Sequence, residues 1–239
     1  MLNDKEKSYQ LVPPMMSYLE IYDVPSATLA ILIIPGGGYK ELSMNPVKSA
    51  IKWLKSREIC AIVLNYRCGE NYNYPTPFLD AKNCMKQAAE ITKKRNMQLG
   101  VCGFSTGAHL AAMLTLQAPK SLIPSFAILV YPLLTMGEFT HKNSRKYLLG
   151  KGENDDILIN ATSAEKWSYK NVPPIIAFHG LNDTVVSVKN TKMLYTSLRE
   201  VGITNMEIKI YKSLRHGSSV TSHPWIYDLE KWLKEYKYI

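Results

Sequence analysis

The chain has 239 residues, of which 46% are hydrophobic and 21% are charged, and its formal net charge is +9. This length and composition fit one globular domain with a sizeable core, and we expect a single domain over residues 1–239. No apolar run approaches the roughly 20 residues that a membrane-spanning helix needs, so we expect no membrane partner.

The positive charge does not by itself indicate binding to nucleic acid. Lysine outnumbers arginine 23 to 6, and the lysines are spread along nearly every expected helix. Because no basic segment has interleaved aromatic residues, we expect a solvated lysine-rich surface and no nucleic-acid partner. The polar segment at residues 1–10 lacks the apolar core and cleavage site of a signal peptide, so a cytoplasmic location is expected.

The four cysteines give no sign of a metal or redox site. They are scattered without C-x-x-C spacing, and two of them lie in apolar segments that resemble strands. A free thiol in such a segment behaves as a small hydrophobic group. We therefore expect Cys60, Cys68, Cys84 and Cys102 to be reduced, and we expect no metal.

The first part of the chain predicts buried strands alternating with helices. Residues 18–24 and 29–34 are typical of strands, and the second is almost continuously apolar, which favours a sheet covered by helices on both faces. It ends in the glycine run Pro35-Gly36-Gly37-Gly38-Tyr39, whose backbone can turn N–H groups toward a ligand. Next come a helix capped by Asn45 with Pro46 in its first turn, a strand over 59–64 and a helix over about 78–94.

The segment from Met97 to Leu116 carries the strongest motif. An apolar strand over 99–102 leads into Gly103-Phe104-Ser105-Thr106-Gly107 and then an apolar helix over 108–116. A chain of this length contains G-x-S-x-G by chance in roughly one case in ten, so the flanking strand and helix give the pattern its specificity. Together they predict a nucleophile elbow, in which two glycines relieve crowding and the Ser105 hydroxyl projects beyond the sheet. The alternative is a small-residue turn without chemistry.

The rest of the chain continues the alternation. Strands are expected over 126–131, 175–178 and 206–211, with helices over 187–201, ended by Gly202, and over about 225–236. Residues 133–170 are predicted to be irregular, with short helical pieces at best, and to form the wall of a substrate cleft rather than a separate lid domain. The pattern predicts an α/β fold, namely a three-layer α/β/α sandwich with a mostly parallel sheet.

The acidic partner of the serine can be found by elimination. Of the seven aspartates, only Asp183 follows a buried strand between Ser105 and the late histidines. In open α/β sheets the site lies beyond the carboxyl ends of the strands, where Asp183 is expected. A turn-forming role for this aspartate is the alternative.

Five histidines compete for the role of the base. His216 follows the last strand on a loop, which is where a base is expected, and His223 is its main rival. His109 lies one helical turn beyond Ser105 and is expected to be structural. His179 closes a strand and is expected to brace the loop of the acid, while His141 lies in the irregular region.

These residues together predict acyl transfer. His216 would take the proton of Ser105 as its oxygen attacks an ester carbonyl, and Asp183 would orient the imidazole. The oxyanion would be bound by the Thr106 N–H and by an N–H of Gly37 or Gly38. The order serine, aspartate, histidine is that of α/β-hydrolases.

Several motifs resemble one group of that family. Between about residues 27 and 232 the chain contains P-G-G-G-Y, Tyr66-Arg67, G-F-S-T-G-A-H-L, Tyr131-Pro132, H-G-x-x-D at 179–183 and His216-Gly217. It is most similar to the small, lidless acetyl xylan esterase-like carboxylesterases. The resemblance implies serine esterase activity on small acyl esters, often acetyl groups on sugars, without a cofactor. It implies the same triad and oxyanion donors, and it suggests that Tyr39 borders the substrate.

The sequence departs from the group at three places. The related H-G-G-G motif lacks its histidine here, the elbow has Thr106-Gly107-Ala108 where Ala-Gly-Gly is more common, and Arg215 precedes the base. The leading hypothesis is a serine carboxylesterase for short acyl groups, with acetylated carbohydrates as the expected substrates. Two alternatives are a peptidase of the prolyl-oligopeptidase type and a non-catalytic binding protein with a hydrolase fold.

Overall fold

The structure, a computed structural model, describes residues 16–117, 119–167, 169–218 and 225–239. Seven strands form one sheet in the order β1-β3-β2-β4-β5-β6-β7, in which β1 pairs antiparallel with β3 and the other pairs are parallel. The mostly parallel sheet predicted from the sequence is thus confirmed. The strands are β1 (Tyr18–Tyr22), β2 (Leu29–Ile34), β3 (Cys60–Asn65), β4 (Gln98–Phe104), β5 (Ala127–Val130), β6 (Ile175–Gly180) and β7 (Met206–Tyr211).

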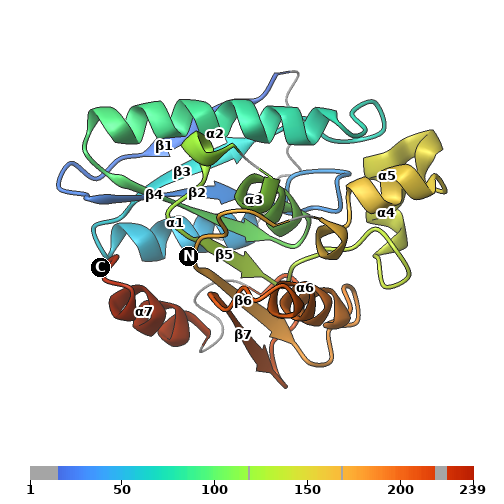
Figure 1. The fold of residues 1–239 in the computed structure, drawn as a ribbon. Coiled ribbons are helices and arrows are strands. Elements are labelled where there is room, and N and C mark those ends of the chain that lie inside the picture. The colour runs from blue at the N-terminus through green and yellow to red at the C-terminus, as the bar shows by residue number, and fades with distance from the viewer. Residues whose placement is uncertain (1–15, 118, 168, 219–224) are drawn as a thin grey trace, which may run out of the picture.

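Helices cover both faces of this sheet (Figure 1). Helices α2, α3 and α6 lie on one face and α1 and α7 on the other, which confirms the three-layer sandwich. Helices α4 and α5 lie beyond the carboxyl ends of the strands, within the region predicted to be irregular. The helices are α1 (Asn45–Lys55), α2 (Thr76–Lys94), α3 (Thr106–Gln117), α4 (Lys142–Leu149), α5 (Asp156–Ala161), α6 (Lys189–Glu200) and α7 (Trp225–Glu235).

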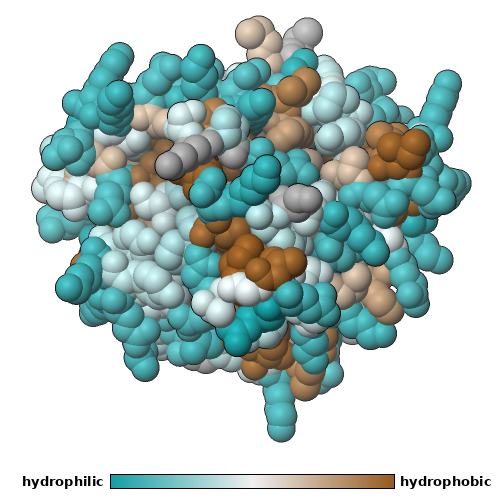
Figure 2. Space-filling model, viewed as in Figure 1, coloured by the Kyte–Doolittle hydropathy of each residue, from teal (hydrophilic) through white to brown (hydrophobic). Residues whose placement is uncertain are grey.

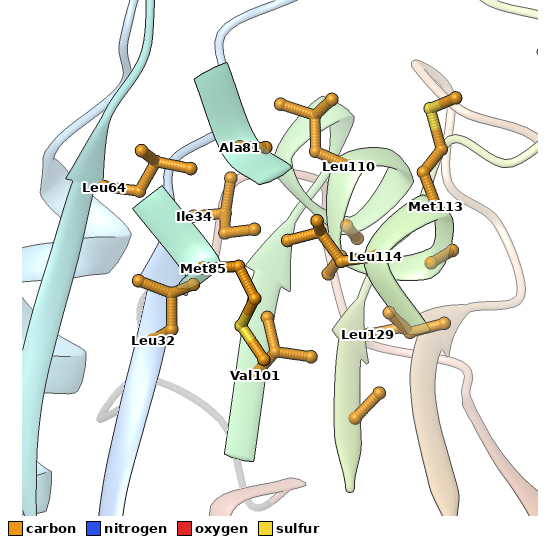
Figure 3. Packing of buried hydrophobic residues seen from close by; sticks show 14 of the residues in the cluster. Leu32, Ile34, Leu64, Ala81, Met85, Val101, Leu110, Met113, Leu114 and Leu129 are labelled. Carbon is orange, nitrogen blue, oxygen red and sulfur yellow. The ribbon is translucent and has the colours of Figure 1, made fainter. Parts of the chain in front are cut away.

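The core is divided in two by the sheet. All residues of β2 are buried, and its even-numbered side chains pack in the cluster under α2 and α3 while its odd-numbered ones pack under α1 and α7. Figure 3 shows the first cluster, in which Met85 of α2 and Leu114 of α3 lie over Leu32 and Val101 of the sheet. Burial on both faces explains why the strand is apolar at every position.

Element boundaries differ from the predicted ones by a few residues. Helix α1 has Met44 rather than Asn45 at its N-cap, because the Lys48 N–H already bonds to the Met44 carbonyl at 2.9 Å. Helix α6 ends as predicted, since Gly202 takes a φ of +81° directly after the C-cap residue Val201.

The face of the molecule drawn in Figure 2 is mainly hydrophilic. On the face drawn in Figure 2, hydrophobic side chains form small separate groups among hydrophilic ones. Within the described ranges, no helix has the length and apolar character needed to cross a membrane. Cys60, Cys68, Cys84 and Cys102 are free and buried.

Candidate active site

The sheet register brings the glycine run next to the serine motif. Strands β2 and β4 are parallel neighbours, and Ile34 at the end of β2 pairs with Gly103 near the end of β4. The turn after β2 and the turn after β4 therefore emerge side by side at the carboxyl edge of the sheet. A Cβ atom at Gly36 would lie 3.0 Å from Cβ of Ser105, which shows how closely the two turns approach.

The turn around Ser105 has the tight geometry that its glycines suggested. Ser105 has a φ of +54°, a conformation that non-glycine residues rarely adopt. A Cβ at Gly103 would lie 2.4 Å from the Gly107 carbonyl oxygen, and one at Gly107 would lie 2.1 Å from that of Ile34. Neither position accepts a side chain without backbone movement. The Ser105 N–H donates to the Val130 carbonyl at 3.0 Å, which ties the turn to β5.

Three predicted residues from distant segments form one hydrogen-bonded chain. The Ser105 Oγ atom lies 2.9 Å from Nε2 of His216, and Nδ1 of His216 lies 2.8 Å from Oδ2 of Asp183. An ionised carboxylate only accepts hydrogen bonds, so Nδ1 carries the proton and Nε2 is free to accept from the serine hydroxyl. This is the tautomer that a general base needs.

The carboxylate of Asp183 is held ionised inside the protein. Its side chain is fully buried, and its Oδ1 atom accepts the N–H groups of Val185 and Val186, both at 2.9 Å. Burial raises the pKa of Asp183, but hydrogen bonds from His179 and His216, together with the Val186 N–H, outweigh it and lower the pKa below its ordinary value. The group therefore stays negative opposite the imidazole at neutral pH.

The other described histidines near the sheet are held in structural positions. The Nε2–H of His179 donates to the Val186 carbonyl at 2.9 Å and also lies 3.4 Å from Oδ2 of Asp183, while Nδ1 bonds to the Thr191 hydroxyl at 2.7 Å. It thus braces the loop that carries the acid, as expected. His109 is fully buried within α3, which agrees with a structural role. His223, the rival candidate for the base, lies outside the described residues.

The glycine run and the start of α3 present two open N–H groups. The Gly38 N–H donates to Oγ1 of Thr106 at 3.2 Å. Among the described residues, the N–H groups of Gly37 and Thr106 have no hydrogen-bond partner. The resemblance suggested that Tyr39 borders the substrate, but its side chain is fully buried and its hydroxyl bonds to Nδ1 of His109 at 2.6 Å. Tyr39 therefore supports the turn from behind and does not line the cleft.

A cleft of about 770 Å³ opens above Ser105 and His216. Its wall includes residues 141–153, so the predicted irregular region does form the wall, and α4 supplies part of it. Arg215 is exposed and does not line the cleft. The other lining residues are Gly36, Gly37, Gly38, Lys40, Glu41, Ser43, Pro46, Glu70, Asn73, Phe104, Tyr131, His141, Asn143, Ser144, Lys146, Tyr147, Gly150, Lys151, Glu153, Val185 and Gly217.

Tyr131 and His141 are among the cleft residues that were not identified as site residues from the sequence. The Tyr131 ring lies 4.8 Å from the His216 ring, centroid to centroid, and its hydroxyl donates to the Ser218 carbonyl at 3.3 Å. Its position directly after the buried strand β5, next to the strand of the elbow, was an available signal. His141 also lines the cleft, and nothing in its sequence neighbourhood marked it.

Comparison with known proteins gives consistent results. A family profile described as alpha/beta hydrolase fold matches residues 31–217. The chain is 31% identical over 220 residues to an acetylxylan esterase of Xylanibacter ruminicola, covering 86% of this chain and 45% of that protein. It is 30% identical over 212 residues to endo-1,4-beta-xylanase B of Butyrivibrio fibrisolvens, covering 82% of this chain and 33% of that one. The chain thus spans a third to a half of these relatives.

Solved structures extend the likeness to the whole chain. An acetyl ester-xyloside bifunctional hydrolase from Caldicellulosiruptor lactoaceticus is 29% identical, with a TM-score of 0.84 and coverage of 100% of this chain and 95% of that one. An esterase from Thermogutta terrifontis phosphonylated by sarin shares the fold at 20% identity, with a TM-score of 0.78 and coverage of 98% and 95%. With its family match over most of its length, the chain belongs to the alpha/beta hydrolase fold family.

Proposed function

We propose that this protein is a serine carboxylesterase that hydrolyses short-chain acyl esters, in particular acetyl esters of carbohydrates. The observation that carries the proposal is the hydrogen-bonded chain from Ser105 through His216 to the buried Asp183. The names of the acetylxylan esterase and of the acetyl ester-xyloside hydrolase support an acetylated carbohydrate as the substrate.

In the first half of the reaction the serine is acylated. Ser105 Oγ attacks the ester carbon while His216 Nε2 takes its proton, and the ionised Asp183 stabilises the imidazolium. The tetrahedral intermediate then collapses, and the same imidazolium gives its proton to the departing alcohol oxygen. The second half repeats these steps with water as the nucleophile, which releases the acid and restores Ser105.

The negative oxygen of the intermediate needs hydrogen-bond donors next to Ser105. We assign the Thr106 N–H and the Gly37 N–H to this role, because both lack partners among the described residues. The Gly38 N–H is engaged by the Thr106 side chain, so Gly38 serves to hold the turn. Each such donor contributes about 3–4 kcal/mol to lowering the barrier.

A fluorophosphonate probe and a series of p-nitrophenyl esters test the proposal. The probe should label Ser105 in the native protein, and the Ser105→Ala variant serves as the unlabelled control. Acetate should be hydrolysed with a higher kcat/KM than octanoate, and acetate should be released from acetylated xylan. Folded protein that is not labelled would favour a non-catalytic binding protein. Cleavage of proline-containing peptides without ester hydrolysis would favour the peptidase alternative.

A further inference from the structure

The cleft contains a second imidazole that the proposed mechanism does not use. His141 occupies the N-cap position of α4 and is half-buried in the cleft wall. Its Nδ1 atom lies 2.8 Å from the hydroxyl of Ser144, which is buried. Its Nε2 atom has no hydrogen-bond partner among the described residues. This atom is not buried, so it is open to the solvent of the cleft.

The wall that carries His141 is held in place on two sides. The Arg145 side chain donates to the Met136 carbonyl at 3.2 Å. From the other side, the Asn73 amide donates to the Tyr147 carbonyl at 2.8 Å. A binding group on a wall anchored in this way loses little conformational freedom when a ligand binds.

His141 lines the same cleft as His216. The alcohol oxygen must lie next to Nε2 of His216, because it receives the proton from there. Burial lowers the pKa of His141, and a positive charge on His216 lowers it further. His141 is therefore neutral at pH 7, and its open nitrogen can form one uncharged hydrogen bond.

The charges along the cleft are balanced, although the protein as a whole is strongly positive. Three lysines and three glutamates line it: Lys40, Lys146, Lys151, Glu41, Glu70 and Glu153. A cleft with no excess of either sign does not favour an anionic ligand. Polar groups around a neutral imidazole suit a neutral ligand rich in hydroxyl groups.

We propose that His141 determines specificity for the alcohol half of the substrate, with its Nε2 atom bonding a free sugar hydroxyl next to the ester. Ser144 acts as a positioning residue that fixes the imidazole through Nδ1. This inference rests on the proposed esterase function and deepens it, because it names the residue that distinguishes a sugar acetate from a simple alkyl acetate.

Two acetates of secondary alcohols test the inference. A monoacetylated methyl xyloside has free hydroxyl groups, whereas cyclohexyl acetate has none but a leaving group of similar size. The His141→Ala variant should lower kcat/KM for the xyloside about tenfold and leave that for cyclohexyl acetate within about twofold, since one neutral hydrogen bond is lost. His141→Gln should recover part of the lost kcat/KM for the xyloside, and Ser144→Ala should lower it less than His141→Ala does. Lys142→Ala, on the exposed side of α4, is the matched control and should leave kcat/KM for both esters unchanged.

If His141→Ala lowered kcat/KM equally for both esters, or for neither, the inference would be overturned. Binding to the inactive Ser105→Ala protein separates it from the esterase proposal. Adding His141→Ala to that variant should weaken binding of the acetylated xyloside about tenfold in calorimetry, and unchanged binding would also overturn it. If the wild-type protein cleaved neither ester but bound the xyloside through His141, the esterase proposal would fail and the subsite would stand.

Discussion

The floor and the wall of the cleft are held by different kinds of contact. We define the floor as Ser105, Asp183, His216 and the glycine turn 36–38, and the wall as residues 141–153 with the loop 70–74 that packs on it. In the floor, backbone approaches backbone so closely that a Cβ at Gly107 would lie 2.1 Å from a carbonyl oxygen. In the wall, side-chain hydrogen bonds such as the one from Asn73 hold α4 in place.

This difference assigns different tasks to the two regions. Bond breaking requires reacting atoms to be placed within a fraction of an ångström, and closely packed backbone provides that rigidity. Recognition of the alcohol requires hydrogen-bonding groups whose arrangement can vary between proteins with the same fold. Floor substitutions should therefore lower kcat for every ester, whereas wall substitutions should change the preference between esters.

The largest effect is expected for Ser105→Ala. Without the nucleophilic oxygen, kcat should fall by about 10⁴–10⁶-fold on both the xyloside acetate and cyclohexyl acetate. Folding should be unharmed, because the substitution removes a partly exposed hydroxyl and keeps the positive-φ backbone. Kinetics on both esters, with thermal unfolding as the control, provide the check. Activity near that of the wild type would show that the nucleophile is misassigned.

Asp183→Asn should have the next largest effect. The amide oxygen can still accept the N–H groups of Val185 and Val186, which turns the amide nitrogen toward His216. A donor at that place favours the imidazole tautomer with a proton on Nε2, which cannot accept the serine proton. We expect kcat to fall about 10³–10⁴-fold on both esters. A fall confined to one alcohol would contradict the assignment of Asp183 to the floor.

The floor could be predicted from the sequence because its constraints act through residue type. Only glycine fits at Gly103 and Gly107, so the elbow leaves a recognisable motif. Asp183 was found by elimination. Asp80, another of the seven aspartates, is engaged by Arg67 in the structure, with contacts of 2.7 and 2.9 Å.

The wall could be predicted only as a region. His141 is placed by α4, whose position depends in part on the contact of Tyr147 with Asn73, 74 residues away in sequence. No local pattern encodes such contacts. The orientation of Tyr39 was missed for the same reason, since its buried partner His109 is 70 residues away.

The buried His109, which contacts residues next to both regions, should make the stability of the fold sensitive to acid. His109 bonds through Nδ1 to Tyr39, next to the glycine turn, and through Nε2 to the Thr162 carbonyl beyond the wall at 2.7 Å. Burial lowers the pKa of His109 to about 4, against the smaller opposing effect of the bond to Thr162. Between pH 6.5 and 4 the unfolded chain therefore takes up a proton that the folded protein does not, so stability falls as the pH falls, by at most about 3 kcal/mol.

The His109→Gln variant isolates this contribution. Glutamine does not titrate, so its free energy of unfolding should change less between pH 7 and pH 4 than that of the wild type. Groups that titrate in both proteins, such as Asp183, cancel in the difference. Urea unfolding at pH 7, 5.5 and 4 measures it, and parallel pH dependences in the two proteins would refute the prediction.

The smallest predicted effect concerns Thr106, where the chain departs from the more common alanine. Its Oγ1 atom accepts the Gly38 N–H at 3.2 Å, so the side chain anchors the turn that presents the Gly37 N–H. Valine keeps the branched shape and the backbone N–H of residue 106 but leaves the Gly38 N–H unpaired. Thr106→Val should lower kcat about tenfold with little change in KM. Thr106→Ser, which keeps the acceptor, should stay within about threefold of the wild-type kcat.

Because the turn serves the oxyanion and not the alcohol, the loss of kcat in Thr106→Val should be equal for the xyloside acetate and cyclohexyl acetate. A loss restricted to the xyloside would mean that Thr106 acts in alcohol recognition, and full activity of the valine variant would mean that the elbow alone holds the turn.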